Sequence, residues 1–152
     1  MKFTELKIAA LEHCNALIFK RINTIQDALM RIEDSRNNES KSSVGDKYET
    51  GRAMMQMEEA KNQAQLSEAL EAKQLLATIK PERKNNKADL GSLVVTSQGI
   101  YFIAVGIGKI IIDGQTLYAI SIAAPIGKAL NNKQKGDKIT FSNRQIVIDS
   151  IY

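Results

Sequence analysis

The chain has 152 residues, of which 43% are hydrophobic and 25% are charged, and these values fit one ordinary globular domain or two small ones. The formal net charge is +4, and the whole surplus lies in residues 81–152, a bias compatible with an acidic partner or a nucleic acid and specific to neither. The single cysteine, Cys14, excludes an internal disulfide and favours a reducing compartment. Polar residues interrupt the first 19 positions, and no apolar run approaches the roughly 18 residues of a membrane span. We therefore expect a cytoplasmic protein with no membrane partner.

Residues 4–33 carry a heptad repeat. Leu11, Ile18, Ile25 and Ile32 occupy one apolar position of the repeat, and the 3-4 spacing is typical of a coiled-coil seam. The other position holds Ile8, Asn15, Ile22 and Leu29, so Asn15 is expected to be the polar residue within the seam.

Residues 34–45 are rich in Ser and Asn, whose local hydrogen bonds compete with the helix backbone, and a turn is expected there. A second helix is predicted for residues 46–79, which are rich in strong helix formers. The simplest arrangement of two long helices with a short turn is an antiparallel hairpin in a monomer, and an intermolecular coiled coil is the alternative. The apolar stripe expected on the second helix comprises Met54, Met57, Ala60, Ala64, Leu66, Leu70, Leu75 and Leu76.

The period changes after residues 81–89, which contain no large apolar side chain and are predicted to be a linker. Short runs rich in β-branched and aromatic residues then predict strands, and Asp113-Gly114 predicts a two-residue hairpin turn. Residues 125–130, with Pro125 at the first position, predict one short helix. The fold class is therefore α+β, with a helical hairpin followed by a small antiparallel sheet. The strands are expected at 92–96, 100–105, 109–112, 116–122, 138–141 and 145–151.

Two carboxylates, Asp46 and Glu49, lie three residues apart where the second helix begins, so they would share one helix face. The same spacing also fits a capping box, in which Asp46 is the N-cap and only starts the helix. Both interpretations remain open at this point. Nearby basic residues would either pair with the acids or contact RNA phosphates; they are Lys41, Lys47 and Arg52.

Other residues with reactive side chains give weaker signals. His13 lies outside the seam without a partner ligand, which indicates a solvated surface residue, and nothing near Cys14 marks a lowered pKa. Gly106-Ile-Gly108 lacks the third glycine of a dinucleotide fingerprint and is interpreted as a turn. A basic cluster is interpreted as a solvated face, with docking of an acidic surface as the alternative; it comprises Lys128, Lys133, Lys135 and Lys138.

Two stretches occur together that resemble one known family. They are Gly45-Asp46-Lys-Tyr-Glu49, and Ile120-Ser-Ile-Ala-Ala-Pro125-Ile-Gly-Lys-Ala-Leu130 followed by Lys135-Gly-Asp-Lys. Over nearly its whole length the chain is similar to the GreA/GreB transcript cleavage factors, which are elongation factors of bacterial RNA polymerase. The resemblance implies a coiled-coil hairpin over residues 1–80, with its acidic tip near 34–51. It also implies an FKBP-like domain over residues 90–152.

The resemblance also implies a function and the residues that perform it. Asp46 and Glu49 match the acids that enter the polymerase's secondary channel and help to hold a second Mg²⁺ at its active site. The factor would then have no cofactor of its own and would be an activator of RNA cleavage by the polymerase rather than an enzyme, with the tip near nascent RNA. The loop expected to dock on the polymerase comprises Ala124, Pro125, Ile126 and Lys128.

The sequence departs from the family pattern after the acids. Residues 50–53 are Thr-Gly-Arg-Ala where the family usually has Asn-Ala-Glu-Tyr, and Ala124 stands where Ser is common. A secondary-channel regulator that does not stimulate cleavage, or a coiled-coil interaction module, is therefore the alternative function.

Overall fold

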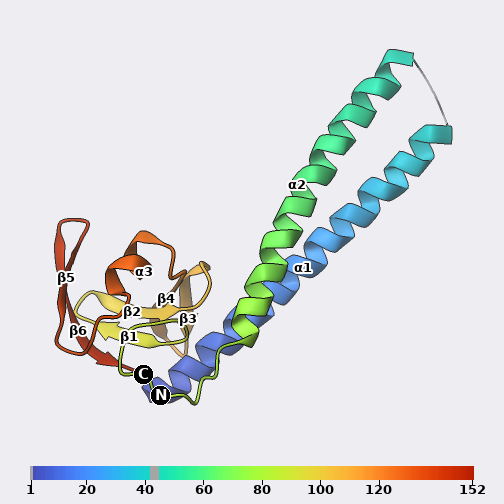
Figure 1. Ribbon diagram of the computed structural model, residues 1–152. Coiled ribbons are helices and arrows are strands. Elements are labelled where there is room, and N and C mark those ends of the chain that lie inside the picture. The colour runs from blue at the N-terminus through green and yellow to red at the C-terminus, as the bar shows by residue number, and fades with distance from the viewer. Residues whose placement is uncertain (1, 42–44) are drawn as a thin grey trace. The chain divides into compact units, whose positions relative to one another are not determined.

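The computed structural model describes residues 2–41 and 45–152, and in the helical segments 39–41 and 45–48 it describes the backbone only. Two long helices precede six strands and one short helix, so the predicted α+β class is confirmed (Figure 1). The helices are α1 (Phe3–Lys41), α2 (Gly45–Ala77) and α3 (Pro125–Leu130). The strands are β1 (Leu93–Thr96), β2 (Gly99–Ile103), β3 (Gly108–Ile112), β4 (Gln115–Ile120), β5 (Lys138–Phe141) and β6 (Arg144–Ile151).

Contacts divide the chain into two compact units. We call residues Leu17–Lys73 the arm, and residues Met1–Ala16 together with Gln74–Tyr152 the body. Each unit is described by itself.

The arm is a pair of antiparallel helices. Helix α1 continues to Lys41, so the turn predicted to begin at residue 34 was wrong for residues 34–41, whereas residues 42–44 lie outside the described part of the chain. Ser and Asn each disfavour a helix interior by less than about 1 kcal/mol, and tertiary contacts override such small costs. One such contact is the ion pair between Arg36 of α1 and Glu59 of α2.

The seam on α1 follows the predicted heptad in the arm and departs from it nearer the N-terminus. Ile18, Ile22 and Ile32 are buried as expected. Asn15 is exposed, so its predicted place in the seam was wrong, and Cys14 is buried instead. Residues 1–16 belong to the body and not to the arm, so packing within the body, instead of the two-helix seam, decides which side of α1 is buried at Cys14 and Asn15.

The apolar stripe predicted on α2 was right in part, because Leu66 and Leu75 are half-buried and Leu76 is buried, and wrong for the other residues. Met54 and Met57 are 66% and 74% exposed, and Ala60, Ala64 and Leu70 are exposed too. Helix α2 carries small, flexible and polar side chains on all of its faces. The positions of its apolar residues in the sequence therefore do not identify the face that packs against α1. The less exposed residues of α2 in the arm are Gly51, Met55, Glu59, Asn62, Leu66, Ala69 and Ala72.

The six strands form one sheet in the order β3-β4-β2-β1-β6-β5. All six predicted strands and the Asp113-Gly114 hairpin are confirmed, and both turn residues have positive φ angles, 51° and 76°, as this type of turn requires. The sheet differs from the fully antiparallel prediction because β2 and β4 pair in parallel. The chain reverses after β2 and the β3–β4 hairpin returns β4 to the side of β2, so these two strands run in the same direction.

Helix α3 covers part of the sheet's core. Its Leu130 is fully buried, and half-buried Ile126 and Ala129 pack against the same cluster. Gly127 allows the close approach, because a Cβ atom there would lie 2.1 Å from the carbonyl oxygen of Ser121. The buried members of the cluster are Ala88, Val94, Ile103, Ile120, Leu130, Ile139, Ile146 and Ile148.

The segment 81–89 is hydrogen-bonded to other parts of the body. The backbone N–H of Ala88 donates to the carbonyl oxygen of Lys133 at 2.8 Å, and the side-chain amide of Asn85 donates to the carbonyl oxygen of Tyr152 at 3.1 Å. The first bond holds the segment to the residues that follow α3, and the second holds it to the end of β6.

Candidate functional site

The predicted acidic site lies at the start of α2. The backbone of both Asp46 and Glu49 is helical, and three residues in a helix place two side chains on neighbouring positions of one face. Glu49 is exposed, whereas the side chain of Asp46 lies outside the described residues. The arm therefore presents a carboxylate within the first turns of α2, at the end of the hairpin where α1 stops and α2 begins.

The helix boundary bears on the capping-box interpretation. Helix α2 begins at Gly45, one residue before Asp46, so Asp46 lies inside the first turn instead of preceding the helix. A carboxylate in the first turn is stabilised by the partial positive charge of the helix N-terminus, typically by 0.3–1 kcal/mol. Stability measurements on Asp46 variants separate this role from that of an N-cap.

Three basic residues lie near the two acids in the sequence. Arg52 is exposed, and the side chains of Lys41 and Lys47 lie outside the described residues. Among residues 2–41 and 45–152, excluding those described by backbone alone, no group of three or more His, Cys, Asp or Glu residues is placed to hold a metal ion.

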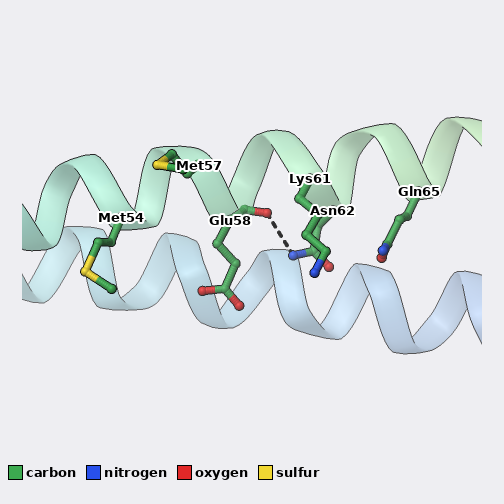
Figure 2. A pocket seen from close by; sticks show the side chains of 6 residues that line it. All are labelled: Met54, Met57, Glu58, Lys61, Asn62 and Gln65. Atoms are coloured by element: carbon green, nitrogen blue, oxygen red, sulfur yellow. Dashed lines mark hydrogen bonds between the residues drawn. The ribbon is translucent and has the colours of Figure 1, made fainter.

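A shallow groove runs along α2 beyond the acids. It has a volume of about 600 Å³, and Figure 2 shows Met54 and Met57 at one end and Lys61, Asn62 and Gln65 toward the other. The Asn62 side-chain amide donates to the carbonyl oxygen of Glu58 at 2.9 Å, which orients it along the helix. Both methionines were expected in the apolar stripe of the second helix, but they are exposed, so this apolar surface was not predicted from the sequence.

The second predicted site surrounds the start of α3. Pro125 and Lys128 are exposed, Ala124 is half-buried, and Ile126 packs partly against the core. Ala124 has no side-chain hydrogen bond to cap the helix, as expected where Ala replaces Ser. Two of these four side chains are therefore exposed at the start of α3, and Ile126 attaches this part of the helix to the core.

The remaining candidates behave as solvated or inert groups. His13 is exposed as predicted, and the basic cluster of Lys128, Lys133, Lys135 and Lys138 is exposed as well. Cys14 is fully buried, and burial raises the pKa of its thiol to about 11. A thiol with so high a pKa carries almost no thiolate near neutral pH, which argues against a nucleophilic role.

Sequence reasoning missed one buried charged residue. Lys7 is 1% exposed in the body, and its ammonium group donates to the carbonyl oxygen of Arg83 at 2.9 Å. The nearest signal in the sequence is its position four residues before Leu11 and seven before Cys14, a spacing that places all three residues on one face of a helix.

No protein-family model matches the chain, and no curated protein matches it. Among solved structures, the structure of the transcription factor Gfh1 is similar with a TM-score of 0.35 and 16% sequence identity, over 91% of this chain and 92% of that one. An identity this low carries no function from that protein to this chain. No helix in the described part of the chain is long and apolar enough to cross a membrane.

Proposed function

We propose that this protein is a Gre-like transcription factor that binds bacterial RNA polymerase and delivers the tip of its arm into the secondary channel. There, Asp46 and Glu49 stimulate cleavage of backtracked RNA by the polymerase. The observation that carries the proposal is the exposed carboxylate of Glu49 in the first turns of α2, beside Asp46 and at the end of a two-helix arm.

The dimensions of the arm support delivery of charge into a narrow channel. In the arm, α1 contributes about seven turns and α2 about eight, each on the order of 40 Å at about 1.5 Å per residue. The ion pair between Arg36 and Glu59 ties the two helices together near the end that carries the acids. Two helices packed together hold the tip in position better than a single helix would. The acids need such a fixed position if they are to bind a metal ion together with the polymerase.

The chemistry follows from the type of ligand. Two carboxylates are hard oxygen ligands suited to Mg²⁺, and they would fill only part of a six-coordinate shell, so the polymerase and the RNA would supply the rest. A second divalent ion activates water and stabilises the leaving oxygen in phosphodiester hydrolysis. Asp46 and Glu49 would bind and orient that ion, and the chain would act as an activator rather than an enzyme.

The start of α3 is the proposed surface that docks on the polymerase. Pro125 and Lys128 would make the contact, and Ile126 would hold α3 to the core. This gives the two halves of the protein separate tasks, anchoring by the body and chemistry by the tip.

A cleavage assay on stalled elongation complexes of the matched bacterial polymerase tests the proposal. The variants are Asp46→Asn and Glu49→Gln, which remove charge while keeping size, and Asn is as good an N-cap as Asp. Cleavage is expected to fall roughly 10–100-fold, the range typical when a partner of a metal site is removed. Glu68→Gln and Glu71→Gln are the matched controls, because both acids are exposed on α2 far from the tip.

The outcomes separate the alternatives. If the tip variants bind polymerase and cleave as well as the parent, the acids do not act in cleavage. If the parent binds polymerase and suppresses cleavage, the chain is a channel regulator without cleavage activity. If it fails to bind polymerase, the interaction-module interpretation is favoured.

A further inference from the structure

A half-open cavity of about 510 Å³ lies in the body, and its lining residues come from neither the arm nor α3. The start of α1, the segment 81–86 and the end of β6 form its walls, and all of these residues belong to the body. This volume falls within the range of small-molecule sites, about 300–1,000 Å³. Much of the wall is apolar, and the lining residues used below are Lys7, Ile8, Pro81, Arg83, Ile151 and Tyr152.

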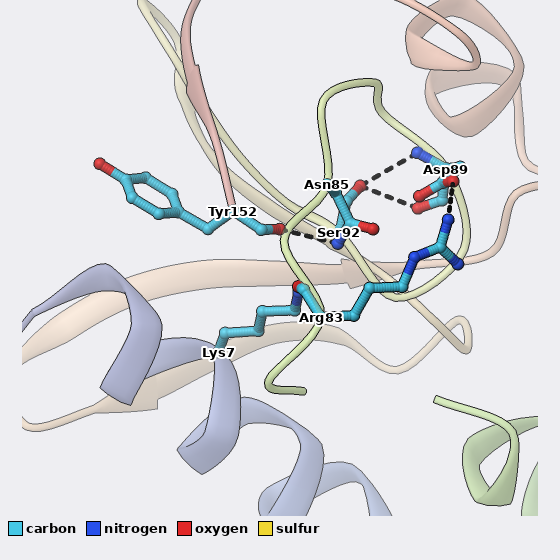
Figure 3. A network of polar contacts seen from close by, with 6 residues as sticks. All are labelled: Lys7, Arg83, Asn85, Asp89, Ser92 and Tyr152. Carbon is cyan, nitrogen blue, oxygen red and sulfur yellow. Dashed lines mark hydrogen bonds and ion pairs between the residues drawn. The ribbon is translucent and has the colours of Figure 1, made fainter. Parts of the chain in front are cut away.

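The cavity contains a buried cation. The Lys7 side chain forms part of the wall, and its ammonium group has a single hydrogen-bond partner among the described residues, the carbonyl oxygen of Arg83 at 2.9 Å (Figure 3). An ammonium group carries three donors, so two remain for another acceptor. Burial lowers the pKa of Lys7, while the negative charges of Asp89 and Glu82 act in the opposite direction.

No carboxylate of the described residues forms an ion pair with Lys7. The nearby carboxylate of Asp89 lies 3.8 Å from the guanidinium of Arg83 instead. A buried charge without a counter-ion is costly, and a chain normally avoids it unless the charge has a use.

The rim and the walls indicate the kind of molecule that would supply the counter-ion. Among the lining side chains, Arg83 and Lys84 add positive charge to that of Lys7 and only Glu82 is negative, so the lining side chains favour an anion. The aliphatic side chains of Ile8, Pro81 and Ile151 offer apolar contact beside the charge. The amide oxygen of Asn85, another lining residue, has no hydrogen-bond partner in the described part of the chain, but it is an acceptor and cannot bind an anion, so the Lys7 ammonium is the group that would do so.

We propose that this cavity binds a small amphipathic carboxylate, with the Lys7 ammonium as its counter-ion and Ile8, Pro81 and Ile151 as the apolar contact. The assignment does not depend on the role of the acids at the tip. It differs from a purely structural role for Lys7, in which the ammonium only ties α1 to the Arg83 carbonyl and the cavity stays filled with water.

The first test compares two probes of the same shape on the full chain. 3-Phenylpropionate carries the carboxylate, and 3-phenylpropanamide replaces it with a neutral amide. In an NMR titration of ¹⁵N-labelled protein, the acid is expected to shift the signals of residues 81–86 and 151–152 in a saturable way, with binding at least about tenfold tighter than the amide, since charged hydrogen bonds are the stronger ones. Equal binding of both probes, or no shift by the acid up to about 10 mM, a concentration that would detect even millimolar affinity, overturns the proposal.

Variants test the residues. Lys7→Met keeps an unbranched side chain of similar length and is expected to weaken binding of the acid at least about tenfold while leaving binding of the amide unchanged. The control is Lys87→Met, because Lys87 is an exposed cation that does not line the cavity. Ile8→Trp fills the cavity from a residue that is already 38% exposed, and it should abolish binding of both probes even if Lys7→Met fails to fold. Unchanged affinity in both of these cavity variants would show that the probe binds elsewhere.

Discussion

Replacing Gly127 by alanine tests the close contact between α3 and the residues that follow β4. The added Cβ would lie 2.1 Å from the Ser121 carbonyl oxygen and 3.0 Å from the Ile122 Cα, and both are backbone atoms that cannot rotate away. Even to reach 3.0 Å from the oxygen, α3 must move by about 0.9 Å, which pulls Leu130 and Ile126 from the core. Overpacking of this kind typically costs 1–3 kcal/mol, and we expect about 2–3 kcal/mol because no side chain can yield.

Urea unfolding followed by circular dichroism measures the change, and thermal unfolding should show a decrease in Tm of roughly 5–10 °C for a protein of this size. The matched control is Gly106→Ala. Nothing lies within 4 Å of a Cβ at Gly106, and its φ is not positive, so the change should leave stability unaltered or raise it by up to about 1 kcal/mol. If Gly127→Ala unfolds within about 0.5 kcal/mol of the parent, which is the usual range for surface changes, the close approach of α3 is wrong.

Two further predictions concern ionisable groups in the body. Because burial raises the pKa of Cys14 from 9.0 to about 11, its reaction with a thiol reagent at pH 8 should be at least about 100-fold slower in the folded protein than in urea, and similar rates would contradict its burial. Because burial lowers the pKa of Lys7 below 10.5, the folded protein loses this proton at a lower pH than the unfolded chain. Between the two pKa values the unfolded state binds more protons, so stability rises with pH. The free energy of unfolding of the parent minus that of Lys7→Met should therefore increase from neutral pH toward 10.5, and a flat difference would refute the reasoning.

Local patterns in the sequence were sufficient for most of the secondary structure. The β-branched runs predicted all six strands, Asp113-Gly114 predicted a turn with two positive φ angles, and Pro125 predicted the start of α3. Each of these signals acts through residues close together in the chain, so neighbouring side chains and backbone angles decide the outcome. The same holds for Asp46 and Glu49, whose shared helix face follows from a spacing of three residues.

Tertiary structure decided the features that depend on distant residues. The length of α1 past residue 34 and the inward face of α2 depend on how the two helices pack, and neither helix carries that information alone. The parallel pairing of β2 and β4 follows from the path of the intervening hairpin. The cavity is the clearest case, because Lys7 meets Arg83 across 76 positions and Asn85 meets Tyr152 across 67. A buried lysine becomes recognisable only when folding removes the water around it and shows which charges are left unpaired.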